Sequence, residues 1–468
     1  MSAALSPHAT GAVIAAAVRA REVTAVAVAE AALDRISRTH GQLNAFTTVT
    51  ARRALAEAAA VDAAVVAGRD PGPLAGVPYG VKDLFDLEGT VTWAGSKILR
   101  ESPPAATDAT AVARLKAAGA VCVGAVNMGE FAYDFVTENA HAGATRNPRD
   151  LTRSAGGSSG GSGAAVAAGL VPFSLGTDTN GSIRVPSSFC GIWGLKPTYG
   201  RLSRAGAFPF VAGLDHIGPL ARSVTDLALA YDAMQGPDAL DAACANRPSE
   251  PAAPCIDAGA GGLRIALLGG YFASGGDPLA HAAVERLAGA LGVTRRIELP
   301  AVDCARAAAF VITASEGGRL HLDRLRARAA DFDPAARDRL LAGAMLPAAW
   351  YVQAQKFRGW WREQVLRVFR DVDVLLAPAT PVPATLLGQE KMTLAGRELL
   401  VRPNLGLFTQ PISFIGLPVV AAPLQHAAGS LPLAVQLIGA PWAEASLLRL
   451  ARHLESSGVC AAPAAPIT

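Results

Sequence analysis

The chain has 468 residues, of which 51% are hydrophobic and 17% are charged, and its formal net charge is only +3. This composition is typical of a globular protein with a large core and excludes a disordered chain. The sequence has no basic block with interleaved aromatic residues, so we do not expect nucleic acid as a partner.

The cysteines are spaced singly and form neither a CxxC pair nor a histidine cluster of the kind that binds zinc. They are Cys122, Cys190, Cys244, Cys255, Cys304 and Cys460. This spacing predicts a reduced, cytoplasmic protein without a structural metal. The alanine-rich start has no basic leader, and the uncharged segments 154–177 and 403–443 contain too much glycine or proline for a membrane span. We therefore expect neither a signal peptide nor a membrane-spanning segment.

Helical spacing and turn residues predict the elements of the first part of the chain. The predicted helices are 6–22, 24–40 and 51–68, and the predicted strands are 43–50, 74–86 and 118–128. Thr24 is expected to cap the second helix and Gly68 to end the third. Lys82 is expected at the end of the buried strand within 74–86.

The second part of the chain is predicted by the same signals. A helix is expected over 220–234, started by Ser223 with Asp226 at its third position, which is a capping box with aspartate in place of glutamate. Segment 247–262 is the best candidate for a linker. The remaining predictions are a strand at 263–270, a mainly helical region over 278–370, a strand near Val374 and buried strands within 413–423 and 431–441.

Strands alternate with helices from one end of the chain to the other, and no internal repeat is present. This alternation predicts an α/β architecture with a large central sheet, mostly parallel or mixed, covered by helices on both faces. We expect residues 1–468 to form a single domain.

Residues 156–184 have the sequence GGSSGGSGAAVAAGLVPFSLGTDTNGSIR, and three interpretations of this stretch fail. A phosphate-binding loop requires a lysine, which is absent between Arg153 and Arg184. A dinucleotide fingerprint started at Gly161 ends on Val166 instead of glycine. A flexible linker would not continue into an apolar helix and strand. What remains is backbone of unusual geometry beside small hydroxyl side chains.

That geometry fits acyl transfer. Gly181 and Ser182 follow a turn, where successive N–H groups can point at one oxyanion. A serine nucleophile needs a base, but neither His141 nor His216 lies in a recognisable triad pattern. A buried lysine that is neutral near pH 7 can take this role, and Lys82 is the lysine best placed for it. Taken singly, Lys82 beside an aspartate is typical of a surface ion pair, and either serine is typical of a turn cap.

Three motifs together resemble the amidase signature family: GVPYGVKD around Lys82, GGSSGGSGAAVAAG from Gly156, and GTDTNGSIRVPSSFCGIWGLKPT from Gly176. The resemblance continues through NMGEFAYDFVTENAHAGATRNP, GRLSRAGAFPFVAGLDHIGPLARSVTDLALAYDAMQG and DVLLAPATP, so it covers nearly the whole chain. Within the family, these flanks resemble the 1-carboxybiuret hydrolase branch more than the glutamyl-tRNA amidotransferase A subunits.

The resemblance implies a catalytic role for three residues. Ser182 matches the acylated nucleophile, Ser158 matches the bridging serine that follows a cis peptide bond, and Lys82 matches the base. The oxyanion hole would consist of the backbone N–H groups of Thr179, Asn180, Gly181 and Ser182. Many members have glycine where this chain has Asn180, and asparagine tolerates left-handed backbone or can reach the substrate.

Other polar residues in the motifs are expected to have structural roles. Ser159 and Ser162 are expected to form internal hydrogen bonds, and Asp178 and Arg184 to support the loop, with a buried charge pairing. His216 is expected to be a structural histidine.

Substrate recognition is predicted from chemistry alone. A carboxylate on a planar ureido compound suits an arginine fork, and Arg402 is the preferred candidate, with Tyr133 and Gln410 as lining residues. A surface position is an equal alternative for Arg402.

The sequence therefore predicts an amidohydrolase that cleaves a C–N bond of a small linear ureido or amide compound, similar to 1-carboxybiuret, and releases ammonia without a cofactor. The alternatives are a broad-specificity amidase, an allophanate-type amidase, or a protein similar to the glutamyl-tRNA amidotransferase A subunits. The resemblance further implies a small accessory subunit, together with a homodimer of the large chain.

Overall fold

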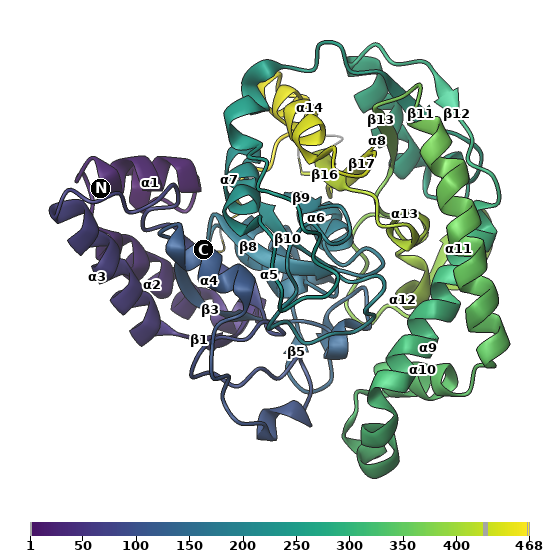
Figure 1. The fold of residues 1–468 in the computed structure, drawn as a ribbon, viewed down its shortest axis with the longest axis horizontal. Coiled ribbons are helices and arrows are strands. Elements are labelled where there is room, and N and C mark those ends of the chain that lie inside the picture. Colours follow the sequence, from purple (N-terminus) through teal and green to yellow (C-terminus); the bar gives the residue numbers. More distant parts are fainter. Residues whose placement is uncertain (1, 425–428, 466, 468) are drawn as a thin grey trace.

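The computed structural model describes residues 2–424, 429–465 and 467. In this part of the chain, an 11-stranded sheet of order β1-β3-β2-β8-β10-β9-β16-β17-β13-β11-β12 runs through the molecule (Figure 1). In chain order its strands are β1 Phe46–Val49, β2 Pro78–Lys82, β3 Val121–Val126, β8 Phe173–Asp178, β9 Trp193–Lys196, β10 His216–Ala221, β11 Ile265–Leu268, β12 Arg296–Ile297, β13 Val374–Pro378, β16 Val419–Leu424 and β17 Leu433–Gly439.

The sheet is mixed. Parallel pairing joins β2 to β3 and β8 at one end of the sheet, and β11 to β12 and β13 at the other. Antiparallel pairing runs across the centre, from β8 through β10, β9, β16 and β17 to β13. The predicted α/β class is confirmed.

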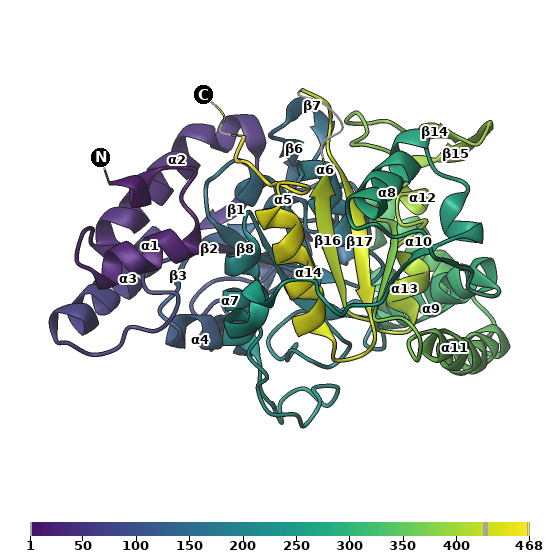
Figure 2. The ribbon, with the colours of Figure 1, turned by 90° about the horizontal axis from the view of Figure 1, so that it is seen from above.

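Helices lie on both faces of the sheet, as the sequence predicts. On one face α5 and α6 pack together, and on the other α7 packs against α14 (Figure 2). The helices are α1 Gly11–Arg19, α2 Ala25–Leu43, α3 Ala51–Val66, α4 Thr110–Ala117, α5 Gly160–Ala167, α6 Arg184–Cys190, α7 Val224–Met234, α8 Pro278–Ala290, α9 Val302–Arg328, α10 Pro334–Ala344, α11 Ala348–Val368, α12 Val401–Asn404, α13 Gln410–Phe414 and α14 Glu444–Ser456.

Short hairpins lie outside the main sheet. They pair β4 Glu138–Asn139 with β5 Gly143–Ala144, β6 Arg146–Asn147 with β7 Asp150–Ser154, and β14 Lys391–Leu394 with β15 Arg397–Leu400. Helices α10 and α11 both pack against α9 at the side of the molecule drawn in green in Figure 1, and α13 also packs against α9.

Most predicted elements occur where the sequence places them, with shorter bounds. Thr24 caps α2 by accepting a hydrogen bond from the Ala27 N–H at 3.1 Å. The mainly helical region 278–370 also contains the short strand β12. Segment 247–262 contains a 3₁₀-helix, Ala253–Ala258, which packs against α7 and α14.

The predicted capping box at α7 is only half formed. The Ser223 hydroxyl accepts from the Asp226 N–H at 3.1 Å, as expected. The Asp226 carboxylate, however, accepts from the N–H groups of Gly11 at 2.7 Å and Ala12 at 2.9 Å. The first N–H groups of a helix have no partner within the helix and bind a carboxylate well. Asp226 therefore joins α7 to the start of α1 instead of capping its own helix.

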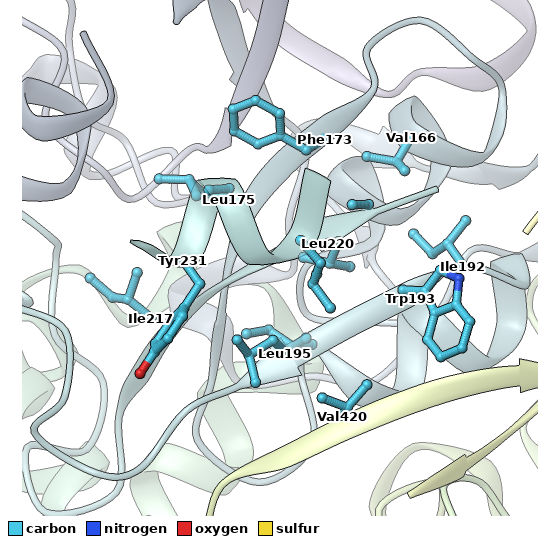
Figure 3. Packing of buried hydrophobic residues seen from close by; sticks show 14 of the residues in the cluster. Val166, Phe173, Leu175, Ile192, Trp193, Leu195, Ile217, Leu220, Tyr231 and Val420 are labelled. Carbon is cyan, nitrogen blue, oxygen red and sulfur yellow. The ribbon is translucent and has the colours of Figure 1, made fainter. Parts of the chain in front are cut away.

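The core lies between the sheet and its helices. Trp193 is fully buried beside Ile192, and Tyr231 of α7 reaches the same layer (Figure 3). The central strands carry apolar side chains on both sides, with little alternation between apolar and polar residues, because helices cover both faces of the sheet. The packed sheet therefore holds the loops at its edge in place. These loops form the candidate site.

None of the described helices is long and apolar enough to cross a membrane. All six cysteines are free thiols.

Candidate active site

Two neighbouring strands bring the candidate catalytic segments together. β2 and β8 are parallel, so their carboxyl ends lie at the same edge of the sheet. Lys82 is the last residue of β2, and Asp178, the last residue of β8, leads directly into the turn 179–183. The loop before α5 carries Ser158 to the same edge.

Lys82 is the centre of this arrangement. Its Nζ lies 2.7 Å from the Ser158 Oγ and 2.8 Å from the Thr177 Oγ1, and its side chain is fully buried. Burial lowers the pKa of Lys82 to about 7, against the opposing effect of Asp215, Asp178 and Asp134. A lysine with this pKa is largely neutral in mildly alkaline solution and can accept a proton.

The neighbouring Asp83 does not pair with Lys82. Its carboxylate accepts from the Thr47 hydroxyl at 2.7 Å and is buried, so the surface ion pair that the local sequence suggested is not formed. Burial also lowers the pKa of Lys196 to about 7, but the Nζ of Lys196 donates to the carbonyl groups of Pro197 and Leu417. Contact with a serine hydroxyl, and not the pKa alone, distinguishes Lys82.

Ser158 follows a cis peptide bond, Gly157–Ser158, at the position that the family resemblance implied. Its two serine neighbours have structural partners. The Ser159 hydroxyl donates to the Thr177 carbonyl at 3.2 Å, and the Ser162 hydroxyl donates to the Leu175 carbonyl at 2.8 Å. Both bonds fasten the loop and α5 to strand β8.

Ser182 lies in the turn after β8 and is 3% exposed. Gly181 before it has φ +143°, and a Cβ on this residue would lie 2.3 Å from the Thr409 Oγ1, so no other residue fits. The N–H groups of Asn180, Gly181 and Ser182 have no acceptor among the described residues. They are available to an oxygen bound beside Ser182.

A buried ion pair supports this turn, as the sequence predicts. Arg184 contacts Asp178 at 2.9 Å, with both side chains fully buried, and also donates to the Gln436 Oε1 at 2.7 Å and to the Ser413 hydroxyl. Burial alone would raise the pKa of Asp178, but the charge and hydrogen bonds of Arg184 hold it well below its usual range. The Asp178 carboxylate also accepts from the Ile183 N–H at 3.2 Å.

Asn180 has a negative φ, so the backbone at this position does not require a residue that tolerates the left-handed conformation. Its side-chain Nδ2 donates to the Thr313 Oγ1 of α9 at 2.9 Å, and its Oδ1 is buried without a partner. The Asn180 carbonyl accepts from the Thr409 hydroxyl at 2.7 Å. An unpartnered buried amide oxygen is costly unless a ligand N–H pairs with it.

A narrow hollow opens at Ser182. Its wall is made by the loop 132–135, the turn after β8, and helices α9, α10 and α13. The predicted lining residues Tyr133 and Gln410 lie on this wall, and so does Asn180.

Arg402 does not line the hollow. It is bound to the carboxylates of Asp134 and Glu138, each at 3.3 Å. The arginine that does line the hollow is Arg339 of α10, which sequence reasoning missed. No local signal marks it, because α10 reaches the site only through its packing on α9.

A larger cavity of about 200 Å³ adjoins the hollow and shares Ala132, Thr179 and Phe210 with it. Thr177, the hydrogen-bond partner of Lys82, also lines it. Thr179 donates through its hydroxyl to the partly buried Asp215 at 2.6 Å. The hollow and the larger cavity are therefore neighbours that share Thr179, and only the hollow reaches Ser182.

His216 lines the larger cavity and is neutral, because burial lowers its pKa well below the usual value. Its Nδ1 lies 2.6 Å from the Leu214 carbonyl and 3.0 Å from the Asp178 carbonyl. It holds the turn after β8 and forms no hydrogen bond with Ser182.

Among the described residues, no group of three or more histidine, cysteine, aspartate or glutamate side chains is placed to hold a metal ion. The arrangement instead offers a low-pKa lysine, a bridging hydroxyl, a second serine and free backbone N–H groups. These are the parts that an acyl-transfer reaction requires.

Comparison with known proteins agrees with this chemistry. Residues 27–448 match the family model described as Amidase. The chain belongs to the amidase family and is an amidohydrolase.

The chain is 56% identical over 433 residues to AtzE, a subunit of the 1-carboxybiuret hydrolase of Pseudomonas sp. (strain ADP), covering 92% of this chain and 95% of that protein. It is 40% identical over 456 residues to the A subunit of the glutamyl-tRNA(Gln) amidotransferase of Roseiflexus sp. (strain RS-1), covering 92% of each. The chain also superposes on a solved structure with a TM-score of 0.95 and 54% identity, over 97% of this chain and 99% of that chain. That structure is described as a vestigial protein complex that reveals the evolutionary origins of an s-triazine catabolic enzyme.

Proposed function

We propose that this amidase hydrolyses a C–N bond of a small linear ureido compound similar to 1-carboxybiuret and releases ammonia, with Lys82, Ser158 and Ser182 as its catalytic residues. The contact of a buried, low-pKa lysine with the bridging Ser158 is the observation that carries the proposal. The 56% identity to a 1-carboxybiuret hydrolase subunit supports the substrate class.

Acylation begins when Ser182 Oγ attacks the substrate carbonyl carbon. Its proton moves to Ser158 Oγ while the Ser158 proton moves to neutral Lys82. The N–H groups of Thr179, Asn180, Gly181 and Ser182 stabilise the oxyanion that forms.

The C–N bond then breaks, and the leaving nitrogen takes a proton from Ser158, which regains one from Lys82. Ammonia departs and leaves an acyl ester on Ser182. In deacylation, water attacks the ester carbonyl and gives its proton to the same relay. The C–O bond to Ser182 breaks, the Ser182 oxygen is protonated, and a carboxylic acid is released. One amide and one water thus yield one acid and one ammonia.

The partners and the domain organisation of the chain are proposed from one matching structure and from the sheet. The matching solved structure is described as a protein complex, which supports a small accessory subunit beside this chain. A homodimer of the large chain and a cytoplasmic location remain predictions. One sheet extends from β1 to β12, which supports a single amidase domain over residues 1–468.

Ammonia release tests the proposal. The purified chain is assayed against 1-carboxybiuret, biuret, allophanate, malonamide and simple amides, with and without the candidate small subunit. We expect turnover of 1-carboxybiuret and labelling of Ser182 by a neutral fluorophosphonate probe. Labelling at another residue would contradict the mechanism, and a clear preference for simple amides would contradict the substrate class.

A further inference from the structure

The larger cavity beside the hollow has no role in the proposed mechanism. Its volume is about 200 Å³, and a cavity needs only about 10–15 Å³ of such space to hold one water molecule. Ammonia is similar in size to water, so the cavity has room for much more than the ammonia that the enzyme releases. Solvent-exposed residues, among them Pro209 and Leu240, line the outer part of the cavity.

The inner part of the cavity adjoins the proton relay. Its wall includes Thr177, whose Oγ1 lies 2.8 Å from the Nζ of Lys82. The same Nζ contacts Ser158, which gives its proton to the leaving nitrogen in the proposed mechanism. The leaving nitrogen must therefore face the relay, and Thr177 joins the relay to the cavity.

Thr179 forms the boundary between the hollow and the larger cavity. It lines both spaces, and its N–H group is a proposed donor to the oxyanion. A substrate carbonyl held at this N–H has its acyl portion on the side of the hollow, which reaches Ser182, and its nitrogen toward the relay. A substituent on this nitrogen would therefore enter the larger cavity.

The charges on the cavity wall suit a departing amine. Arg204 pairs with Asp241 at 2.9 Å and donates to the Ala212 carbonyl at 2.6 Å, so its charge is already compensated. Asp215 accepts from the Thr179 hydroxyl and from two backbone N–H groups, and no arginine, lysine or histidine of the described residues forms an ion pair with it. Burial raises the pKa of Asp215, but these three hydrogen bonds favour its charged form.

An alkylamine has a pKa similar to that of a lysine side chain, about 10.4, so it becomes a cation once it has left the substrate. A carboxylate without a counter-ion attracts such a cation. Apolar side chains complete the wall and can pack against a short alkyl group. They include Leu84, Ala132, Ala207, Phe208 and Ile217.

We propose that the larger cavity binds the leaving amine, so that the enzyme also hydrolyses secondary amides whose leaving nitrogen carries a methyl or ethyl group. This inference rests on the proposed function and extends it from ammonia to small primary amines. Ser182 attacks the carbonyl carbon, the C–N bond breaks, and the nitrogen takes a proton from Ser158 and leaves as a primary amine. Water then releases the acid from Ser182, so one secondary amide and one water yield one acid and one amine.

The test compares 1-carboxybiuret with derivatives that carry a methyl or an ethyl group on the terminal nitrogen, which otherwise leaves as ammonia. The proteins are the wild-type chain, with its small subunit where activity requires it, and two variants that fill the cavity, Ala205→Leu and Ala207→Leu. Ala260→Leu is the matched control, because Ala260 is also half-buried and lines a different pocket beside β11. Ammonia, methylamine and ethylamine are measured separately by chromatography.

We expect the wild-type protein to release methylamine and ethylamine with kcat/KM within about tenfold of the value for 1-carboxybiuret. In each cavity-filling variant, kcat/KM for the ethyl derivative relative to 1-carboxybiuret should fall by about 10- to 200-fold, the effect of a methylene that a pocket rejects. This ratio should keep its wild-type value in Ala260→Leu. Labelling of Ser182 by a neutral fluorophosphonate reports whether each variant is folded.

Two outcomes would overturn the inference while the proposed function stands. One is a wild-type protein that releases ammonia from 1-carboxybiuret but no amine from the alkyl derivatives. The other is an equal loss for both kinds of substrate in cavity-filling variants that are still labelled at Ser182, which would assign the cavity to water or ammonia alone. Absence of both ammonia release and Ser182 labelling in the wild-type protein would instead overturn the proposed function.

Discussion

The Nζ of Lys82 lies 2.7 Å from the Oγ of Ser158, at the common edge of two parallel strands. These residues are separated by 76 positions in the sequence, and the sheet brings them together. Burial lowers the pKa of the Lys82 amine and the sheet brings it to Ser158, so the proposed base depends on the fold and not on a local motif alone.

Replacing Lys82 with methionine keeps most of the buried volume and removes the proton acceptor. We expect kcat to fall by about 10²- to 10⁴-fold, the usual contribution of general acid–base catalysis. Lys356→Met, on the exposed side of α11, should leave the rate unchanged. Steady-state ammonia release measures both variants, and substantial activity in Lys82→Met would exclude this residue as the base.

The pH dependence follows from the same residue. Because burial lowers the pKa of Lys82 to about 7, the amine is protonated below this pH and cannot accept the Ser158 proton. The pH profile of kcat/KM should therefore rise with a single limb near pH 7 and level off above it. A profile that is flat from pH 5 to 9 would show that another group, or no titrating group, controls the reaction.

The sequence predicts the local geometry of the candidate site because glycines and hydroxyl side chains at fixed spacing describe local backbone conformation. The turn at Gly181 and the pairing of Asp178 with Arg184 are of this kind. Substrate recognition depends instead on helices packed from elsewhere in the chain. The structure therefore places Arg339 at the hollow and Arg402 in an ion pair, a difference that no spacing rule reveals.

Gly181→Ala tests the turn that carries the free N–H groups. A Cβ would lie 2.3 Å from the Thr409 Oγ1 at a φ that L side chains rarely adopt, so the turn must shift. We expect a loss of about 1–3 kcal/mol in stability and at least a hundredfold loss in kcat, in line with removal of one oxyanion donor.

The control for this turn is Gly359→Ala in helix α11. Apart from its chain neighbours and the backbone of its own helix, no atom lies within 4 Å of a Cβ added at Gly359, so the free energy of unfolding should stay unchanged or rise by about 0.5–1 kcal/mol. Urea unfolding and ammonia release measure both variants. If Gly181→Ala retains full activity, the backbone at this residue does not form the oxyanion hole.

Arg184→Met should strongly destabilise the fold. It leaves the Asp178 carboxylate buried without its counter-ion, which costs about 3–5 kcal/mol in the free energy of unfolding. Arg296→Met is the control, because Arg296 and Glu285 pair on the surface with side chains 50% and 55% exposed, and its loss should cost less than about 1 kcal/mol. Similar midpoints in urea for the two variants would show that the buried pair does not support the turn.

The pair of Asn180 and Thr313 offers a test of substrate contact. Asn180→Gly keeps the backbone N–H, removes the side-chain amide and introduces the residue that many family members have. We expect kcat/KM for 1-carboxybiuret to fall about tenfold, the value of one hydrogen bond at about 1.4 kcal/mol. Thr313→Val should cost less, because it removes only the acceptor that orients Nδ2 at 2.9 Å.

In the double variant, Thr313→Val should add almost nothing to the loss of kcat/KM caused by Asn180→Gly. The reason is that Thr313 acts by orienting the Asn180 side chain, which the first substitution has already removed. Values of kcat/KM for the four proteins form a double-mutant cycle that measures this coupling. Strictly additive losses would mean that Thr313 acts independently of Asn180. Full activity in Asn180→Gly would mean that the asparagine side chain merely fills the place of glycine and makes no contact with the substrate.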